Sequence, residues 1–323
     1  MTKKYFSEFI LITYCSNIYN LIYWLDWHLN IINFEHGIVI INNTINETDK
    51  KMLEQFYNKI ELIIKPDRIN QSAIYTEYVN KSKSYWVLPI DDDEYLYISD
   101  KYEHDINKLL FVQTNNDKDT FYKYAFNWLL FYSNELQEKF NQKKSYLDLY
   151  RYVYLDKVER QDEVFNIKTI VNTSIYHQYF SDYDETKFVN NNEIDLKNIT
   201  IGNKISMHDH IGTVHNPLSK FKNQFYHAKN LSTNEICAGY KFYNKTSLDM
   251  DCFIAHYKYR TLEEFQIKTQ KYPKMLDVSP YYYSILNQNN FLEKLYEQIK
   301  SELVYFPVLY NLFNKYKNYD NQK

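Results

Sequence analysis

The sequence predicts an α/β fold, with a parallel sheet covered by helices and a helical segment at the C-terminus. Three observations predict it. Short apolar runs of strand length alternate with segments of helical periodicity through the first hundred residues. The fourth apolar run ends in a cluster of acids, at the position where parallel sheets bind ligands. From Gln288 onward, apolar side chains recur again at helical spacing.

Strands and helices alternate strictly in the first hundred residues. Strands are predicted by the apolar runs at 9–13, 36–41, 61–64 and 85–90, the second of them rich in β-branched residues. Helices are predicted by the apolar spacing within 18–32, 52–60 and 69–79. A β-α-β-α-β-α-β order favours a parallel sheet with helical crossovers.

Beyond residue 100 the pattern is looser. The Asn- and Asp-rich stretch 180–203 is typical of a long surface insertion. Thr261 followed by Glu264 forms a capping box, which predicts the start of a helix. We therefore expect one domain over residues 1–275 and a helical appendage over residues 276–323, which packs on the domain or on a second copy of the chain.

The composition excludes several classes of function. Hydrophobic residues make up 45% of the chain and charged residues 24%, as in ordinary soluble proteins. The net charge is −3 and no block of five or more like charges occurs, which argues against a nucleic-acid partner. No apolar run is long enough to span a bilayer, and the first residues lack a leader-like apolar stretch. Three cysteines without metal-ligand spacing indicate a reducing compartment, so we expect a cytoplasmic protein.

Asp91, Asp92, Asp93 and Glu94 directly follow the fourth predicted strand. If the backbone stays extended, the alternate side chains Asp91 and Asp93 point to the same side. Converging carboxylates repel each other unless a cation lies between them. A hard divalent ion, Mg²⁺ or Mn²⁺, meets this need and also binds a diphosphate. A solvated acidic turn is the alternative, and the position at the end of a buried strand favours the ion site.

A series of short motifs occurs in order along residues 8–270. The first are Leu-Ile-Thr-Tyr-Cys-Ser-Asn at 11–17, Tyr-Trp-Leu-Asp-Trp-His at 23–28, Ile-Asn-Asn-Thr at 41–44, Asn-Gln-Ser-Ala at 70–73 and Trp-Val-Leu-Pro-Ile-Asp-Asp-Asp-Glu-Tyr at 86–95. The later ones are Trp-Leu-Leu-Phe-Tyr-Ser-Asn at 128–134, Lys-Thr-Ile-Val-Asn at 168–172, Val-His-Asn-Pro at 214–217 and His-Tyr-Lys-Tyr-Arg-Thr-Leu-Glu-Glu-Phe at 256–265. This ordered set resembles GT-A glycosyltransferases, namely the family-2-like enzymes and those grouped as family 92.

The resemblance implies a GT-A fold, with helices on both faces of a mostly parallel sheet. It implies transfer of a hexose-type sugar from a nucleotide-sugar, in the first place a UDP-sugar, to a glycan or protein hydroxyl with inversion. It places Trp128 and Tyr132 on the acceptor side. The residues that it implies for donor binding follow the predicted strands: Thr13, Asn17, Asn42, Gln71, Asp91 and Asp92.

The resemblance also implies a Mn²⁺ or Mg²⁺ site. A late histidine completes the metal shell in many GT-A enzymes, so the implied ligands are Asp91, Asp93 and His256, with His215 as the second candidate. The alternative for His256, which follows the apolar Phe-Ile-Ala at 253–255, is a structural histidine of the core.

The catalytic base is left open by the sequence. An inverting transfer needs a carboxylate to accept the proton of the acceptor hydroxyl. Asp162, Glu163 and Asp209 are candidates, and each is alternatively a solvated surface charge. Asp209 lies between His208 and His210, a pattern that zinc sites use, but no four-ligand set is visible in the sequence.

Two other functions fit parts of the sequence. A nucleotidyltransferase would use the same acids, but such enzymes usually have a Gly-rich basic loop after the first strand, and the Tyr-Cys-Ser-Asn-Ile at 14–18 has neither Gly nor Lys. A non-catalytic sugar-nucleotide-binding or assembly protein is indicated by departures from the family pattern. Ile18 and Tyr23 stand where the family has Glu, and Asn42 stands where it has Asp. The C-terminal helix is a candidate contact in a homo-oligomer.

Overall fold

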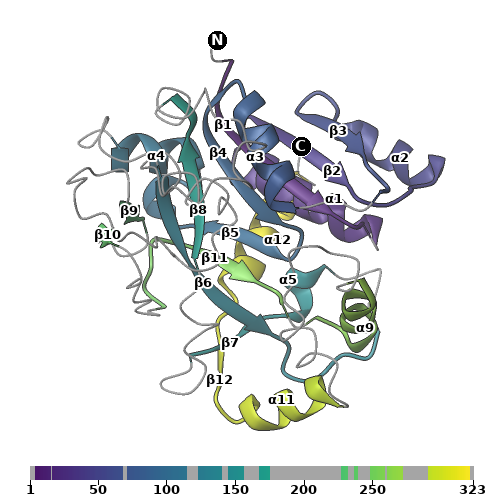
Figure 1. The fold of residues 1–323 in the computed structure, drawn as a ribbon. Coiled ribbons are helices and arrows are strands. Elements are labelled where there is room, and N and C mark those ends of the chain that lie inside the picture. Colours follow the sequence, from purple (N-terminus) through teal and green to yellow (C-terminus); the bar gives the residue numbers. More distant parts are fainter. Residues whose placement is uncertain are drawn as a thin grey trace, which may run out of the picture.

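The protein is described by a computed structural model over residues 4–15, 17–67, 71–114, 123–139, 145–155, 167–174, 227–231, 236–238, 248–258, 260–271 and 290–320. Figure 1 shows a mixed α/β molecule in which helices pack around a curled sheet. The predicted α/β class is therefore confirmed. No helix of the described ranges is long and apolar enough to cross a membrane.

The first ninety residues alternate as predicted. The elements are β1 (Tyr5–Thr13), α1 (Ile18–Asp26), β2 (His36–Ile41), α2 (Glu47–Leu53), β3 (Ile60–Ile64), α3 (Gln71–Lys81) and β4 (Ser84–Asp91). β1 pairs in parallel with both β2 and β4, and β2 pairs in parallel with β3. The four predicted strands thus form a parallel sheet in the order β3-β2-β1-β4, with their carboxyl ends at one edge.

The remaining strands extend this sheet mainly with antiparallel pairs. The elements are β5 (Glu94–Ile98), α4 (Ile106–Thr114), β6 (Lys123–Tyr132), α5 (Tyr146–Leu149), β7 (Tyr152–Tyr154), β8 (Ile167–Asn172), β9 (His227–Asn230), β10 (Ile236–Ala238), β11 (Cys252–His256) and α9 (Leu262–Lys271). β8 lies antiparallel between β4 and β6. The long β6 also pairs with β11, which in turn pairs antiparallel with β5. β6 therefore connects the parallel sheet to the β5–β11 pair, which lies below the parallel sheet in Figure 1.

Apolar side chains bury both faces of the parallel sheet. Successive side chains of a strand point to opposite faces. Phe9 of β1 joins the main core together with residues of α1 and α4. Its neighbour Ile10 packs on the other face, in a cluster with Tyr75 and Val79 of α3. Helices thus cover both faces, as the resemblance implies.

The C-terminal segment contributes α11 (Phe291–Ile299), β12 (Leu303–Tyr305) and α12 (Val308–Asp320). β12 pairs with β7, and α11 packs against the end of β6. α12 inserts Phe313 into the main core, where its ring contacts Trp27 and Tyr23. The predicted C-terminal helical segment is therefore present and packs on the domain, while the predicted boundary at residue 275 lies outside the described residues.

The helix after β1 changes its geometry midway. Periodicity predicted one helix over 18–32, but α1 continues as a π-helix over Trp27–Ile31. On this side, Nε1 of Trp24 donates to the Glu94 carbonyl and Nε1 of Trp27 to the Leu96 carbonyl, both at 2.7 Å. Nε2 of His28 accepts the Leu96 N–H at 3.3 Å. These three side chains form hydrogen bonds with backbone groups on the edge of β5 that no described strand covers. They therefore fix the position of the strand that follows the acids.

We expect His28→Gln to flatten the pH dependence of folding. Burial lowers the pKa of His28 from 6.5 to about 3, against the opposing effect of its bond to the Trp24 carbonyl. Below pH ~6.5 the unfolded chain binds a proton at this ring that the folded chain does not, so the wild type loses up to ~1.4 kcal/mol per pH unit. Urea denaturation at pH 8, 6 and 5 should show that the wild type has the larger free energy of unfolding at pH 8 and that its excess over the variant decreases as the pH falls. Parallel profiles for the two proteins would contradict the expectation.

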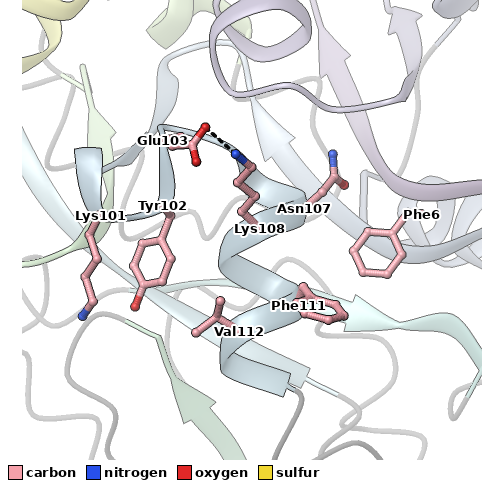
Figure 2. Close-up of a pocket in the computed structure, with 8 residues that line it drawn as sticks. All are labelled: Phe6, Lys101, Tyr102, Glu103, Asn107, Lys108, Phe111 and Val112. Atoms are coloured by element: carbon pink, nitrogen blue, oxygen red, sulfur yellow. Dashed lines mark ion pairs between the residues drawn. The ribbon is translucent and has the colours of Figure 1, made fainter.

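A hollow of about 530 Å³ lies where β1 begins (Figure 2). Phe6 lines it together with residues of η3 (Asp100–Tyr102) and α4, among them the exposed Phe111 and Val112. Phe6 and Thr13 stand near opposite ends of β1, ~23 Å apart at about 3.3 Å per residue. None of the four acids at 91–94 lines this hollow, so the acids mark a different site.

Candidate functional site

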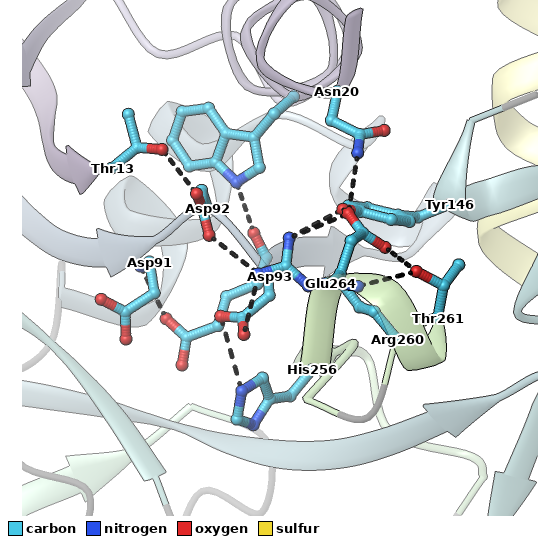
Figure 3. A network of polar contacts seen from close by, with 12 residues as sticks. Thr13, Asn20, Asp91, Asp92, Asp93, Tyr146, His256, Arg260, Thr261 and Glu264 are labelled. Atoms are coloured by element: carbon cyan, nitrogen blue, oxygen red, sulfur yellow. Dashed lines mark hydrogen bonds and ion pairs between the residues drawn. The ribbon is translucent and has the colours of Figure 1, made fainter. Parts of the chain in front are cut away.

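Four acids turn from β4 into β5 at the carboxyl edge of the parallel sheet (Figure 3). Asp91 ends β4, Asp92 and Asp93 form the turn, and Glu94 begins β5. Asp93 and Glu94 are buried, whereas Asp91 and Asp92 are partly exposed. This edge is where α/β proteins bind ligands. The buried acids among the four need counter-charges.

Lys168 of β8 is shared by the first and the last of these acids. Its Nζ lies 3.0 Å from Oδ2 of Asp91 and 2.8 Å from Oε2 of Glu94, and the side chain is fully buried. Burial raises the pKa of Glu94 to about 8, although Lys168 opposes the shift. Burial acts to lower the pKa of Lys168, but the two carboxylates outweigh it and raise that pKa. Lys168 therefore stays charged as a built-in counter-ion.

Asp91 is also held from α3. Nε2 of Gln71 donates to Oδ1 of Asp91 at 2.8 Å, and the Tyr75 hydroxyl lies 3.3 Å from the same oxygen. With Lys168 at the other oxygen, both carboxylate oxygens have protein partners. The structure thus places Gln71, a predicted donor contact, against Asp91.

Asp92 and Asp93 face a second cation, Arg260 (Figure 3). Nη2 of Arg260 lies 3.5 Å from Oδ1 of Asp92 and 3.8 Å from Oδ2 of Asp93. Nε2 of His256 lies 3.6 Å from Oδ1 of Asp93. The Thr13 hydroxyl, at the end of β1, donates to Oδ2 of Asp92. Side chains from β1, β11 and the segment after β11 therefore converge on this turn.

The pairing of β5 with β11 brings His256 to the acids. In the antiparallel register His256 lies opposite Glu94, and the next residue, Tyr257, donates its N–H to the Asp93 carbonyl at 2.7 Å. β11 also pairs in parallel with β6, whose Trp128 packs its ring on His256 at 4.2 Å between centroids. Trp128, predicted on the acceptor side, thus lies directly behind His256.

Arg260 is anchored by Tyr146 and by α9. Nη1 of Arg260 donates to the Tyr146 hydroxyl at 2.7 Å, and this hydroxyl donates to Glu264. The Thr261 hydroxyl accepts the Glu264 N–H and donates to the Glu264 carboxylate, which confirms the predicted capping interaction of these two residues. The Glu264 carboxylate therefore takes part in the cap of α9 and also accepts the hydrogen bond of Tyr146, which contacts Arg260.

A small pocket of about 10 Å³, room for roughly one water molecule, lies beside the acids, between the end of β1 and the first turn of α1. Its lining consists of Thr13, Cys15, Asn17, Asn20, Leu21, Asp92, Tyr146 and Arg260. Asn17 is the N-cap of α1, and Cys15 turns the chain with a φ of 49°. The pocket joins three predicted donor contacts, Thr13, Asn17 and Asp92, with the guanidinium of Arg260.

Two other predicted contacts do not line this pocket. Nδ2 of Asn42 donates to the carbonyls of Lys65 and Asp67, at 2.6 Å each, and so ties the end of β2 to the segment after β3. Tyr132 is buried and packs its ring against Tyr296 of α11. The remaining candidates lie outside the described residues: Asp162, Glu163, Asp209, His215, His208, His210 and the stretch 180–203.

Asp93 and His256 are the predicted metal ligands that the structure brings together. Neighbouring ligands of an octahedral ion with bonds of about 2.1 Å are roughly 3 Å apart, so their 3.6 Å separation needs only a small closure around one ion. No group of three His, Cys, Asp or Glu side chains placed to hold a metal occurs in the described part of the chain. A divalent ion on this pair would therefore need further ligands besides these two side chains.

Sequence reasoning missed both cations of the site. Lys168 and Arg260 lie in motifs that carried the family resemblance, but a single basic residue in a sequence usually indicates a solvated charge. A signal was available for Lys168, because it follows Ile167 in an apolar β-branched strand. A charge inside such a strand needs a buried partner. No comparable local signal marked Arg260.

No protein-family model matches the chain, and no curated protein matches it. Among solved structures, S. aureus TarS is similar with a TM-score of 0.35 and 11% identity, over 90% of this chain and 43% of that chain. A TarS fragment, 1–349, in complex with UDP gives 0.30 and 14%, over 57% and 51%. The 4-diphosphocytidyl-2C-methyl-D-erythritol synthase from Anaerococcus prevotii gives 0.26 and 12%, over 56% and 78%. This chain thus spans less than half the length of the full TarS chain.

Proposed function

We propose that this protein is a metal-dependent GT-A glycosyltransferase. It transfers a hexose-type sugar from a nucleotide-sugar to a hydroxyl of a glycan or protein, with inversion. The donor in this proposal is a UDP-sugar and the metal is Mn²⁺ or Mg²⁺, as the motifs of the sequence imply.

The observation that carries the proposal is the pairing of Asp93 with His256 beside a pocket that contains Arg260. Nε2 of His256 lies 3.6 Å from Oδ1 of Asp93. A carboxylate and an imidazole suit a divalent ion such as Mn²⁺, and a guanidinium suits a diphosphate. All three side chains lie at the edge where parallel sheets bind nucleotides.

The residues divide the chemistry between them. Asp93 and His256 would hold the divalent ion, which would supply Lewis-acid stabilisation of the charge that develops on the departing diphosphate. Thr13 and Asn17, at the end of β1 and the start of α1, line the small pocket beside which we place the donor, and this pocket has to widen for the donor to bind. A carboxylate base accepts the proton of the acceptor hydroxyl, and Asp162, Glu163 and Asp209 remain the candidates for it.

We expect UDP to bind at least about tenfold more tightly with Mn²⁺ than without it. The ion and the diphosphate contact each other in the proposed complex, so each raises the affinity for the other. Calorimetric titration of UDP with and without Mn²⁺ measures this coupling. Release of UDP from UDP-glucose or UDP-galactose, and of GDP from GDP-mannose, in the absence of acceptor, measures turnover.

The other outcomes of this experiment point to other functions. Nucleotide binding without turnover of any donor indicates a sugar-nucleotide-binding protein. In a parallel assay with a nucleoside triphosphate and a sugar phosphate in place of the nucleotide-sugar, release of pyrophosphate indicates a nucleotidyltransferase. A protein that binds no nucleotide, with or without metal, contradicts the proposal.

A further inference from the structure

The acids at 91–94 are divided between two cations that are held differently. Lys168 is fully buried, and its Nζ lies within 3.0 Å of an oxygen of both Asp91 and Glu94. The Arg260 side chain keeps 12% of its surface exposed and lies 3.5 and 3.8 Å from its two acids. A charge-assisted hydrogen bond is shorter, about 2.7–2.9 Å. Lys168 is therefore the fixed counter-ion, and Arg260 is the one placed to exchange partners.

Arg260 has an anchor about which it can turn. Nη1 donates to the Tyr146 hydroxyl at 2.7 Å, and the guanidinium carbon lies 5.1 Å from the centre of the Tyr146 ring. The Glu264 carboxylate lies 3.9 Å from the same Nη1. The other nitrogen, Nη2, faces Asp92 and Asp93. A turn of the guanidinium can redirect Nη2 while the anchor at Nη1 is kept.

We infer that Arg260 is the counter-cation of Asp92 and Asp93 when no donor is bound, and that it becomes a ligand of the diphosphate when the donor binds. The inference rests on the proposed function, because it assumes that the donor carries a diphosphate. A guanidinium forms charge-assisted hydrogen bonds of about 2.7–2.9 Å to such oxygens, and the longer separations of 3.5 and 3.8 Å leave Nη2 without one of this length to Asp92 or Asp93. The transfer of Arg260 to the diphosphate leaves Asp93 to the metal.

This exchange couples metal binding to donor binding. Arg260 competes with Mn²⁺ for the negative charge of Asp93, so Mn²⁺ alone binds weakly. A diphosphate removes this competitor and raises the affinity for Mn²⁺, and Mn²⁺ raises the affinity for UDP by the same factor. A variant without the guanidinium should therefore bind Mn²⁺ alone more tightly and UDP more weakly, and it should keep only the coupling that direct contact between the ion and the diphosphate supplies.

The test is a pair of calorimetric Mn²⁺ titrations, without UDP and with saturating UDP, on the wild type and on Arg260→Gln. In the wild type, UDP should tighten Mn²⁺ binding about tenfold or more. In Arg260→Gln, Mn²⁺ alone should bind several-fold more tightly, and the coupling should fall at least about threefold below that of the wild type. Lys101→Met is the matched control for net charge, because Lys101 is exposed and pairs with Asp251 away from the pocket. It should match the wild type.

The outcomes separate the inference from the proposed function. A wild type that binds neither UDP nor Mn²⁺ contradicts the function and the inference together. Coupling in the wild type that persists unchanged in Arg260→Gln overturns the inference alone. Arg260→Lys keeps the positive charge for folding but lacks the planar fork that spans Tyr146 and the acids. Its coupling should also fall, and wild-type coupling in this variant overturns the inference even where Arg260→Gln does not fold.

Discussion

Lys168→Met is expected to destabilise the protein by about 3–5 kcal/mol, the usual cost of removing one partner from a buried ion pair. The lysine is fully buried and its Nζ is shared by Asp91 and Glu94. Without it, Asp91 loses its cation and Glu94 remains buried among carboxylates. Urea denaturation of the two proteins at pH 7 measures the difference in the free energy of unfolding.

The destabilisation should increase above pH 8. Burial raises the pKa of Glu94 in the wild type from 4.5 to about 8. A carboxyl with a raised folded pKa stabilises most below its unfolded pKa, and this stabilisation is lost as the pH rises to the folded pKa. Below pH 8, Glu94 keeps its proton in both proteins. Above pH 8, the wild-type carboxylate ionises beside Lys168, whereas the variant has no cation there. The difference in the free energy of unfolding between the two proteins therefore widens from pH 7 to pH 9.

Two further variants make the result for Lys168 specific. Lys101→Met removes an exposed lysine that pairs with Asp251 at 2.6 Å, and exposed pairs contribute only about 0–1 kcal/mol. Adding Glu94→Gln to Lys168→Met removes the carboxyl that depends on the lysine above pH 8, and it should abolish the widening of the stability difference between pH 7 and pH 9. A Lys168→Met variant as stable as the wild type at both pH values would show that the acids do not need this counter-ion.

The parallel sheet could be predicted because each of its strands is specified locally. The run 36–41 is continuous, apolar and β-branched, and it forms β2 with the same limits. The later part could not be predicted in this way. β6 pairs with β8 along its first half and with β11 along its second, and these partners lie far away in the sequence. Such pairings leave no periodicity within either strand.

The candidate site was predicted in part, for similar reasons. Asp93 and His256 were both expected from motifs, and the β5–β11 register brings them together. The alternation that placed Asp91 on the same side as Asp93 requires an extended backbone. The chain turns at residues 92 and 93 instead, and Asp91 contacts Lys168. Lys168 and Arg260 acquire their roles only from partners that the fold supplies.

Asp93→Asn is expected to reduce turnover at least about 100-fold and to leave the fold intact. Asp93 is buried, and it is the carboxylate that lies beside His256. Loss of its charge removes one of the two metal ligands, and metal stabilisation of a leaving group amounts to several kcal/mol, of which ~2.7 gives 100-fold. Asn has nearly the same shape, and the Asp93 carbonyl that accepts the Tyr257 N–H belongs to the backbone. The substitution also relieves repulsion from neighbouring acids.

Donor turnover, Mn²⁺-dependent UDP binding and the melting temperature should be measured together on Asp93→Asn and on Asp251→Asn. The control makes the same chemical change at an exposed carboxylate that pairs with Lys101, and it should keep wild-type turnover. Loss of metal-dependent UDP binding in Asp93→Asn, with a melting temperature within a few degrees of the wild type, assigns the carboxylate to the metal. Full turnover in Asp93→Asn rules out a ligand role, because the amide carries no charge to hold the ion. A variant that unfolds instead shows that Asp93 is needed by Arg260 and His256 as a structural partner, and the metal must then be sought at other residues.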